Sequence, residues 1–202
     1  MKELTVLQYG PHAAMVECPA ASALQIAQLL IETSRFVEVV PAERSVLVRL
    51  PGGMSWVEVQ GIVDSLPDVL PQVVGREVVI PVIYDGADLA LVAGATGLTV
   101  EEVIALHSSG TYLAAFAGFA PGYVYCTGLD PRLQLPRRPS PRTSVPAGSV
   151  AIADVYCAVY PSASPGGWHL LGHTDLTLFD LKRPEPALIR PGDRVRYTVR
   201  TS

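Results

Sequence analysis

Apolar and polar residues alternate at two different spacings along the first third of the chain. Residues 4–16 and 36–50 show the two-residue alternation of half-buried strands, each interrupted by a turn. Residues 24–31 and 56–66 place apolar side chains three or four positions apart, which is the spacing of amphipathic helices. This order predicts a small α+β sandwich domain over residues 1–75, with both helices on one face of an antiparallel sheet.

Hydroxyl residues mark the expected starts of three helices. Ser22 and Ser55 precede the two helices above, and Thr99 precedes a helical pattern over residues 100–107. Glu102 stands three positions after Thr99, so the two residues form a capping box.

The remainder of the chain changes from helix to short strands. Residues 76–84 resemble a strand, and Pro81 within it indicates an edge position or a break. After the helical segments 88–93 and 100–107, short apolar runs alternate with proline and glycine to the end of the chain. We expect a second, mainly β domain over residues 76–202, with two leading helical segments and a closed or nearly closed barrel.

The last strands are predicted to form a hairpin over residues 187–199. Pro191, Gly192 and Asp193 would be its turn, and alternate apolar residues after them would form one face.

Composition excludes several classes of protein. A hydrophobic content of 49% allows real cores, while a net charge of -4 argues against a nucleic-acid binder. The three cysteines are widely spaced and show no metal-ligand pattern. No apolar run approaches the roughly 20 residues needed to span a bilayer, and no leader pattern opens the chain. We therefore expect a reduced cytoplasmic protein without a metal site.

The candidate chemistry lies in loops between residues 116 and 174. Glycines there allow close backbone approach to a ligand, and arginines supply a planar fork for an anion. These loops predict a site for a small anionic or amide substrate. The candidate binding residues are Gly118, Pro121, Gly122, Tyr125, Arg137, Arg138, Arg142, Gly148, Ser149, Tyr160, Ser164, Gly166, Gly167 and Trp168.

Each of these loops also has a plainer interpretation. Residues 118–123 could form only a sharp turn, and the arginines could be solvated surface charge. Prolines stiffen the arginine segment, however, so that it loses less entropy when it binds an anion. Gly166 and Gly167 before Trp168 indicate an open backbone concavity beside an aromatic wall, suited to an oxyanion or phosphate.

Two histidines are candidates for catalysis. His107 ends a predicted helix, where it would either interact with the helix dipole or deliver a titratable group to the site. His173 could form an acid–base pair with Asp175. Generic catalytic signatures such as a nucleophile elbow, a Walker A loop or a zinc motif are absent from the sequence.

Several motifs in one order carry a resemblance to a known family. They are Gly118-Phe119-x-Pro121-Gly122-x-x-Tyr125, Pro136-Arg137-Arg138 with Pro141-Arg142, the run from Val145 to Ile152, and Tyr160-Pro161 with Ser164-Pro165-Gly166-Gly167-Trp168. Further matches lie at Tyr84-Asp85-Gly86, around Thr99 to His107, at Leu178-Phe179-Asp180 and at Pro191-Gly192-Asp193. Together these motifs resemble the KipI family, also called allophanate hydrolase subunit 1 or the 5-oxoprolinase B subunit (PxpB).

The resemblance implies a small α+β domain followed by a cyclophilin-like β-barrel domain. It implies a KipA-like partner (allophanate hydrolase subunit 2, or PxpC) and a third, PxpA-like subunit. ATP, with Mg²⁺, would be a co-substrate of the complex in opening an amide or lactam such as 5-oxoproline. The fused modules resemble the carboxyltransferase part of urea carboxylase.

The resemblance leaves other functions open. One founding member of the family inhibits a sensor histidine kinase, so a regulatory role is the alternative. Prolyl isomerase activity is a poor third, since a fold alone does not give function. The sequence does not indicate whether the chain is active alone.

The chain departs from the family pattern at two places. Residues 155–160 replace an expected Gly-Gln-Thr/Ser-Gly type segment, and His173 stands where the family usually has arginine. Both departures fall in the expected site region and affect the expected substrate more than the expected fold.

Overall fold

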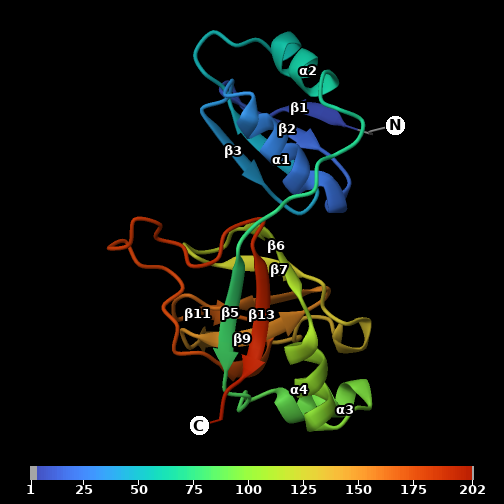
Figure 1. Cartoon of the computed structure of the whole chain (residues 1–202), viewed down its shortest axis with the longest axis vertical. Coiled ribbons are helices and arrows are strands. Elements are labelled where there is room, and N and C mark those ends of the chain that lie inside the picture. Colours follow the sequence, from blue (N-terminus) through green and yellow to red (C-terminus); the bar gives the residue numbers. More distant parts are fainter. Residues whose placement is uncertain (1–3, 202) are drawn as a thin grey trace. The chain divides into compact units, whose positions relative to one another are not determined.

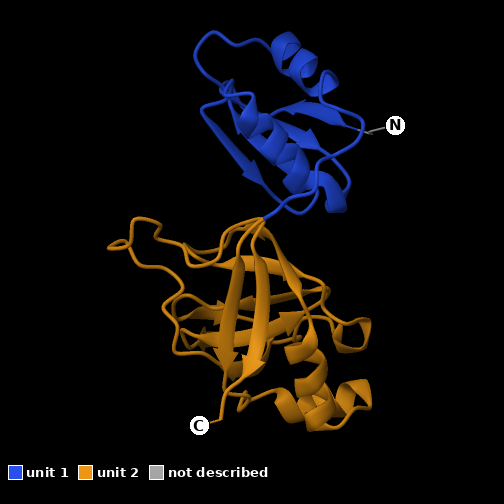
Figure 2. Ribbon diagram, in the orientation of Figure 1, with its two compact units in different colours: residues 1–74 blue, residues 75–202 orange. Residues whose placement is uncertain are grey.

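The computed structural model describes residues 4–201, and the chain divides into two compact units, residues 1–74 (unit 1) and 75–202 (unit 2) (Figure 2). Each unit has its own apolar core.

Unit 1 is a four-stranded antiparallel sheet with two helices (Figure 1). Its elements are β1 (Thr5–Gln8), β2 (Ala13–Glu17), the short helix η1 (Ala20–Ser22), α1 (Ala23–Glu32), β3 (Glu38–Pro41), β4 (Ser45–Arg49) and α2 (Trp56–Asp64). The strand order is β1-β2-β4-β3. Alternate strand residues such as Val16 and Val48 pack with Leu30 of α1 and Val59 of α2 in one core. The strands and the two main helices expected for the first part of the chain are therefore present, in the expected order.

Helix caps in unit 1 differ from one another. Ser55 and Glu58 form a complete capping box at the start of α2. Ser22 stands at the N-cap of α1, but its side chain does not cap the helix, and its hydroxyl donates instead to the Pro19 carbonyl. The prediction that the Ser22 side chain caps α1 is therefore wrong, although Ser22 does occupy the N-cap position.

Unit 2 is a seven-stranded sheet that curls into a nearly closed barrel (Figure 1). Its elements are β5 (Glu77–Val82), α3 (Leu89–Thr96), α4 (Val100–Ser109), β6 (Tyr112–Ala117), β7 (Val124–Thr127), the short helix η2 (Pro131–Leu133), β8 (Arg142–Val145), β9 (Ser149–Ala153), β10 (Tyr156–Val159), β11 (Ser164–Gly166), β12 (His169–His173) and β13 (Arg194–Val199). The order is β12-β9-β10-β7-β6-β13-β5, and β8 pairs with β11 in a separate ribbon. A bridge between Ile83 and His173 joins the two outer edges of the sheet.

Two predictions for unit 2 are confirmed. Thr99 and Glu102 form the predicted capping box at the start of α4. β5 is an outermost strand, which explains how it tolerates Pro81 without a backbone N–H.

The predicted C-terminal hairpin is wrong. β13 pairs in parallel with β5 along its whole length and antiparallel with β6, while Ala187 bridges to Phe179. The predicted turn before β13 is present, because the Asp193 carboxylate accepts a hydrogen bond from the nearby Arg190 backbone N–H. The same carboxylate also accepts one from the backbone N–H of the distant Arg76. Asp193 thus joins the turn to the start of β5.

No single helix of the described residues is long and apolar enough to cross a membrane. Only together would α3 and α4 have the length and apolar composition of a membrane span, and the two helices are bent by 96° relative to each other. Both helices bury side chains in the core of unit 2.

Candidate functional site

One pocket in unit 2 gathers many of the side chains that the sequence singled out. It has a volume of about 220 Å³. We call it the aromatic pocket, and it is lined by Phe119, Tyr123, Tyr125, Arg137, Pro141, Tyr160, Pro165, Gly166, Gly167 and Trp168. The predicted binding residues that meet here are Tyr125, Arg137, Tyr160, Gly166, Gly167 and Trp168.

Edge-to-face ring contacts build the walls of the aromatic pocket. The ring of Tyr123 lies 5.1 Å from that of Tyr125, 5.2 Å from that of Tyr160 and 5.9 Å from that of Trp168. Aromatic rings prefer such contacts, which also fix their orientation. The walls are therefore held in place before any ligand arrives.

Two tyrosines keep their hydroxyl protons in this setting. Burial raises the pKa of both Tyr123 and Tyr160 above its ordinary value. A phenol with a raised pKa is neutral at pH 7 and can donate a hydrogen bond, for example to an amide oxygen.

The two glycines of the pocket have different reasons to be glycine. A Cβ on Gly166 would run into the Tyr160 hydroxyl, so this position needs a residue without a side chain. A Cβ on Gly167 would meet only ordinary contacts, the nearest being the Arg138 carbonyl oxygen at 3.6 Å. The Gly167 carbonyl accepts a hydrogen bond of 2.8 Å from the Arg138 N–H, which joins the two loops.

Arg137 alone of the three predicted arginines lines the aromatic pocket. Its Cζ lies 5.9 Å from the centre of the Trp168 ring, within reach of a cation–π contact. Its Nε is 3.7 Å from an Asp154 carboxylate oxygen, and both side chains are more than half exposed. Such a pair is weak, so the guanidinium remains available to an anionic ligand.

Arg138 and Arg142 point instead to a buried carboxylate. Arg138 Nη1 lies 2.6 Å and Arg142 Nη2 lies 2.8 Å from Asp88 Oδ1, and the Asp88 side chain is only 3% exposed. Asp88 Oδ2 accepts a third hydrogen bond of 2.8 Å from the Leu170 N–H. Burial raises the pKa of the Asp88 carboxyl, but the bonds from Arg142 and Leu170 and the charges of both arginines outweigh it and hold the pKa below its ordinary value.

Sequence reasoning missed Asp88, which it treated only as the start of a helical segment. The partners of Asp88 lie 50, 54 and 82 positions away along the chain. The one local signal was an acidic residue at an N-cap position, and such residues usually cap their helices.

His107 lies inside the core of unit 2. It is fully buried against the rings of Tyr112 and Tyr197, and its Nδ1 lies 2.7 Å from the Tyr84 hydroxyl. Burial lowers the pKa of His107 to about 3, so the ring is neutral at pH 7. This placement favours a structural role over proton transfer with a substrate, and it removes the charge that a helix-dipole interaction would need.

His173 pairs with a different carboxylate from the one predicted. Its Nδ1 lies 2.8 Å from Asp85 Oδ1, whereas Asp175 binds Arg200 at 2.8 Å. The predicted pair of His173 and Asp175 is therefore wrong, because each side chain binds a residue from another segment: Asp85 binds His173, and Arg200 binds Asp175. The side chains of His173 and Asp85 are 40% and 58% exposed.

The other predicted binding residues do not line the aromatic pocket. Gly122 and Gly148 have φ of +80° and +81° and pack against Phe179 and the Thr174 carbonyl, so each is required by its turn. The remaining residues of this kind are Gly118 and Pro121 in the loop after β6, Ser149 at the start of β9 and Ser164 at the start of β11.

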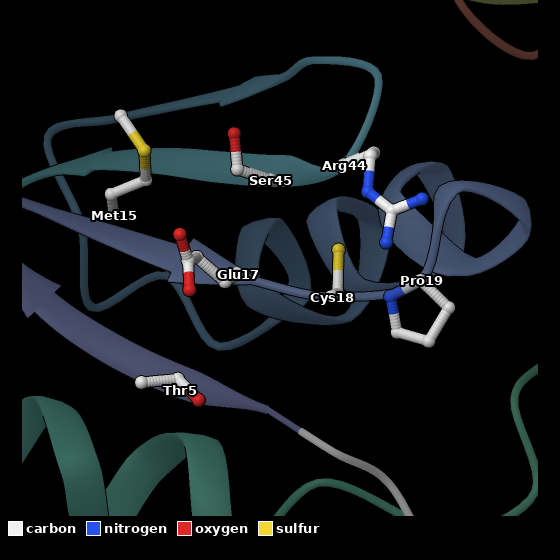
Figure 3. A pocket seen from close by; sticks show the side chains of 7 residues that line it. All are labelled: Thr5, Met15, Glu17, Cys18, Pro19, Arg44 and Ser45. Atoms are coloured by element: carbon white, nitrogen blue, oxygen red, sulfur yellow. The ribbon is translucent and has the colours of Figure 1, made fainter.

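A larger hollow, about 500 Å³ in volume, lies on unit 1 (Figure 3). Thr5, Glu17 and Ser45 stand side by side there on neighbouring strands, and Arg44 and Cys18 complete one end. Burial raises the pKa of the Cys18 thiol, which keeps it protonated. No predicted site residue lies in this hollow, so we place the candidate site in the aromatic pocket despite its smaller volume.

The described residues contain no group of three or more histidine, cysteine, aspartate or glutamate side chains that could hold a metal ion. The aromatic pocket offers tyrosine hydroxyls, one arginine and backbone groups. These suit a small organic ligand with an anionic or amide group.

Comparison with known proteins identifies the family. The family model of the carboxyltransferase domain, subdomain C and D, matches residues 4–189. The 5-oxoprolinase B subunit of Escherichia coli O157:H7 is 42% identical over 181 residues, which cover 86% of this chain and 82% of the relative. The 5-oxoprolinase B subunit of Bacillus subtilis (strain 168) is 39% identical over 180 residues, covering 80% of this chain and 75% of the relative.

Solved structures share the fold. A crystal structure of TTHA0988 superimposes with a TM-score of 0.80 at 36% identity over 100% of this chain, which spans only 40% of the TTHA0988 chain. The Kluyveromyces lactis urea carboxylase gives a TM-score of 0.73 at 20% identity over 98% of this chain and 22% of its own, a likeness of fold alone. This chain therefore belongs to the carboxyltransferase-domain family, subdomain C and D, with the 5-oxoprolinase proteins of the PxpB/KipI type.

Proposed function

We propose that the chain is a subunit of an ATP-dependent complex that hydrolyses a lactam or a related amide, as 5-oxoprolinase does. The names of its relatives support the class of reaction. The observation that carries the proposal to this chain is the aromatic pocket, where rigid rings, phenol donors and one available guanidinium converge.

The pocket suits a small cyclic amide that carries a carboxylate. Flat ring surfaces around Tyr123 and Trp168 would cover the lactam ring, and Arg137 would pair with the carboxylate. A tyrosine hydroxyl would donate to the lactam oxygen. A volume of about 220 Å³ is adequate for a ligand of this size.

Lactams resist hydrolysis near neutral pH because the amide carbonyl is a poor electrophile. Phosphorylation of the amide oxygen by ATP would activate the carbonyl, and cationic groups near the site would stabilise the developing negative charge. Our proposal gives ATP and Mg²⁺ to the complex and assigns them no residue of this chain. The complex would contain a KipA-like (PxpC-like) subunit and a PxpA-like subunit.

The test is 5-oxoproline-dependent ATP hydrolysis, measured with the purified chain alone and then with the KipA-like and PxpA-like subunits. We expect turnover only when all subunits are present. A stable complex that hydrolyses no ATP in the presence of 5-oxoproline would contradict the assignment of this substrate.

A further inference from the structure

Asp88 occupies a helix N-cap but does not cap the helix. An aspartate at this position normally accepts a hydrogen bond from the second or third N–H of its helix. In α3 the Asp88 side chain makes no such bond. Its oxygens are taken by Arg138, Arg142 and the Leu170 N–H. The carboxylate therefore serves distant segments rather than its own helix.

Arg138 and Arg142 depend on this one carboxylate. Within the described part of the chain, Asp88 is the only acidic side chain that forms an ion pair with either of them. Arg138 Nε and Arg142 Nη1 are buried and have no hydrogen-bond partner in the structure. Without the Asp88 charge, two partly buried cations would lie side by side uncompensated, which is strongly unfavourable.

The segment that carries these arginines has few other anchors. Pro136, Pro139 and Pro141 have no N–H to donate. The backbone anchors are a 2.9 Å bond between His169 Nε2 and the Pro136 carbonyl, the bond from the Arg138 N–H to the Gly167 carbonyl, and the pairing of Arg142 with Gly166. The Arg137 side chain adds only the weak, exposed pair with Asp154 and the contact with Trp168. Side-chain attachment to Asp88 is therefore a major constraint on this segment.

The same segment forms one wall of the aromatic pocket. Arg137 and Pro141, which line the pocket, are the immediate neighbours of the two arginines that Asp88 holds. The backbone contacts of Arg138 and Arg142 lead directly to Gly166 and Gly167, which line it from another side. A shift of the two arginines would therefore move both walls.

We propose that Asp88 is a positioning residue for the aromatic pocket. Through Arg138 and Arg142 it fixes the segment 136–142 against Gly166 and Gly167, and so sets where Arg137 stands relative to Trp168. The consequence for substrate binding rests on the proposed function, whereas the effect on the geometry of the pocket does not.

Trp168 provides a reporter of pocket geometry that needs no substrate. The chain has two tryptophans, so Trp56→Phe leaves Trp168 as the only one. Acrylamide quenching of its fluorescence measures how well the wall covers the ring. In this background, Asp88→Asn should raise the quenching constant at least about twofold, because repulsion between the arginines opens the wall.

Asp193→Asn is the matched control. Asp193 is a second buried carboxylate, with a side chain 6% exposed, and it pairs with Arg76 and accepts two backbone N–H groups. It lies in the turn before β13 and does not line the pocket. Both Asp193→Asn and Asp88→Asn should lower the melting temperature, but Asp193→Asn should leave the quenching of Trp168 unchanged.

The outcomes separate positioning from general stability. Equal quenching in Asp88→Asn and the parent, or the same increase in both variants, would overturn the proposal. If Asp88→Asn does not fold, Asp88→Glu replaces it, because this variant keeps the charge but displaces it by one methylene. Unchanged quenching in a folded Asp88→Glu variant would then overturn the proposal.

The proposed function can fail separately. In the reconstituted complex we expect Asp88→Glu to raise KM for 5-oxoproline more than it lowers kcat. A complex without 5-oxoproline turnover would count against the proposed substrate, while increased quenching in the Asp88 variants would still support positioning.

Discussion

At the scale of single residues, unit 2 keeps several ionisable side chains away from water. His107 is buried among tyrosine rings and stays neutral, while Asp88 stays charged because two arginines and a backbone N–H surround it. The two cases follow the same rule: burial disfavours charge unless partners replace the lost hydration.

The neutral state of His107 predicts a dependence of stability on pH. The pKa of His107 is about 3 in the folded chain and near its ordinary 6.5 when unfolded. Below pH 6.5 the unfolded chain binds a proton at His107 that the folded chain does not. The contribution of neutral His107 to the free energy of unfolding is therefore fully present above pH 6.5 and decreases as the pH falls toward 3. The slope should reach about 1.4 kcal/mol per pH unit in the free energy of unfolding.

Urea unfolding between pH 7 and pH 5 checks this prediction before most carboxylates titrate. His107→Gln should reduce the slope, whereas His12→Gln, which changes an exposed histidine, should keep it. Equal slopes in all three proteins would refute the assignment to His107.

Arg142 should matter to activity without being needed for folding. Asp88 keeps Arg138 and the Leu170 N–H when Arg142 is removed. We therefore expect Arg142→Ala to remain folded while turnover of the reconstituted complex drops at least about tenfold, since a barrier increase of roughly 1.4 kcal/mol suffices for that. Arg132→Ala is the control, because Arg132 pairs with Asp130 on the surface. Unchanged turnover in Arg142→Ala would show that the contact of Arg142 with Asp88 does not affect the site.

The three arginines show what sequence could and could not provide. Their spacing and the surrounding prolines were enough to single out the segment. The sequence could not show which arginine lines the pocket and which ones bind a buried carboxylate. Asp88 lies 50 positions upstream of Arg138, and nothing local indicates that Arg137 differs from its neighbour. Likewise, Asp85 rather than the nearby Asp175 is the partner of His173, and only the path of the chain brings them together.

At the scale of elements, the segment 83–88 is held tightly along β12. The Ile83 N–H donates to the His173 carbonyl, and the Gly86 N–H donates to the Leu171 carbonyl. A Cβ on Gly86 would run into the backbone of Leu170 and Leu171. This close approach leads the chain from β5 to Asp88.

Gly86→Ala should therefore destabilise unit 2 by about 2 kcal/mol or more, because backbone rather than a flexible side chain must move. Gly118→Ala is a matched control: its added Cβ would meet only Tyr125 Cε2 at 3.9 Å, and we expect a change within about 0.5 kcal/mol. Thermal unfolding of both variants measures the difference. Equal stability of the two would contradict the close packing of Gly86 on β12.

Elements with a strong local signal were predictable. The Ser55 cap of α2, the capping box of α4 and the hairpin of β3 and β4 appear where residue type and spacing indicated them. The pairing of β13 was not predictable, because its partner β5 comes from the opposite end of unit 2. A parallel pairing of this kind leaves no turn signature in the sequence.

At the scale of the whole molecule, β5 and β13 bring the two ends of unit 2 together, and the bridge between Ile83 and His173 nearly closes the sheet. The aromatic pocket is assembled from three separate segments of the chain, which supply residues 119–125, 137–141 and 160–168. The resemblance to the KipI family predicted that these loops form the site; the family model confirms the family, and the role of the loops stays a prediction. The strand order of the barrel brings the pocket-lining segments together and so determines which side chains meet there.

The central claim is that the aromatic pocket binds the amide substrate, with Arg137 as the partner of its carboxylate. The most direct measurement is KM for 5-oxoproline in the reconstituted complex with the unsubstituted chain, with Arg137→Gln and with the control Arg132→Gln. We predict that Arg137→Gln raises KM at least about tenfold, as loss of a charge-assisted hydrogen bond should, and that the control leaves it unchanged. The same KM in all three complexes would show that the substrate does not bind through Arg137 and would contradict the account.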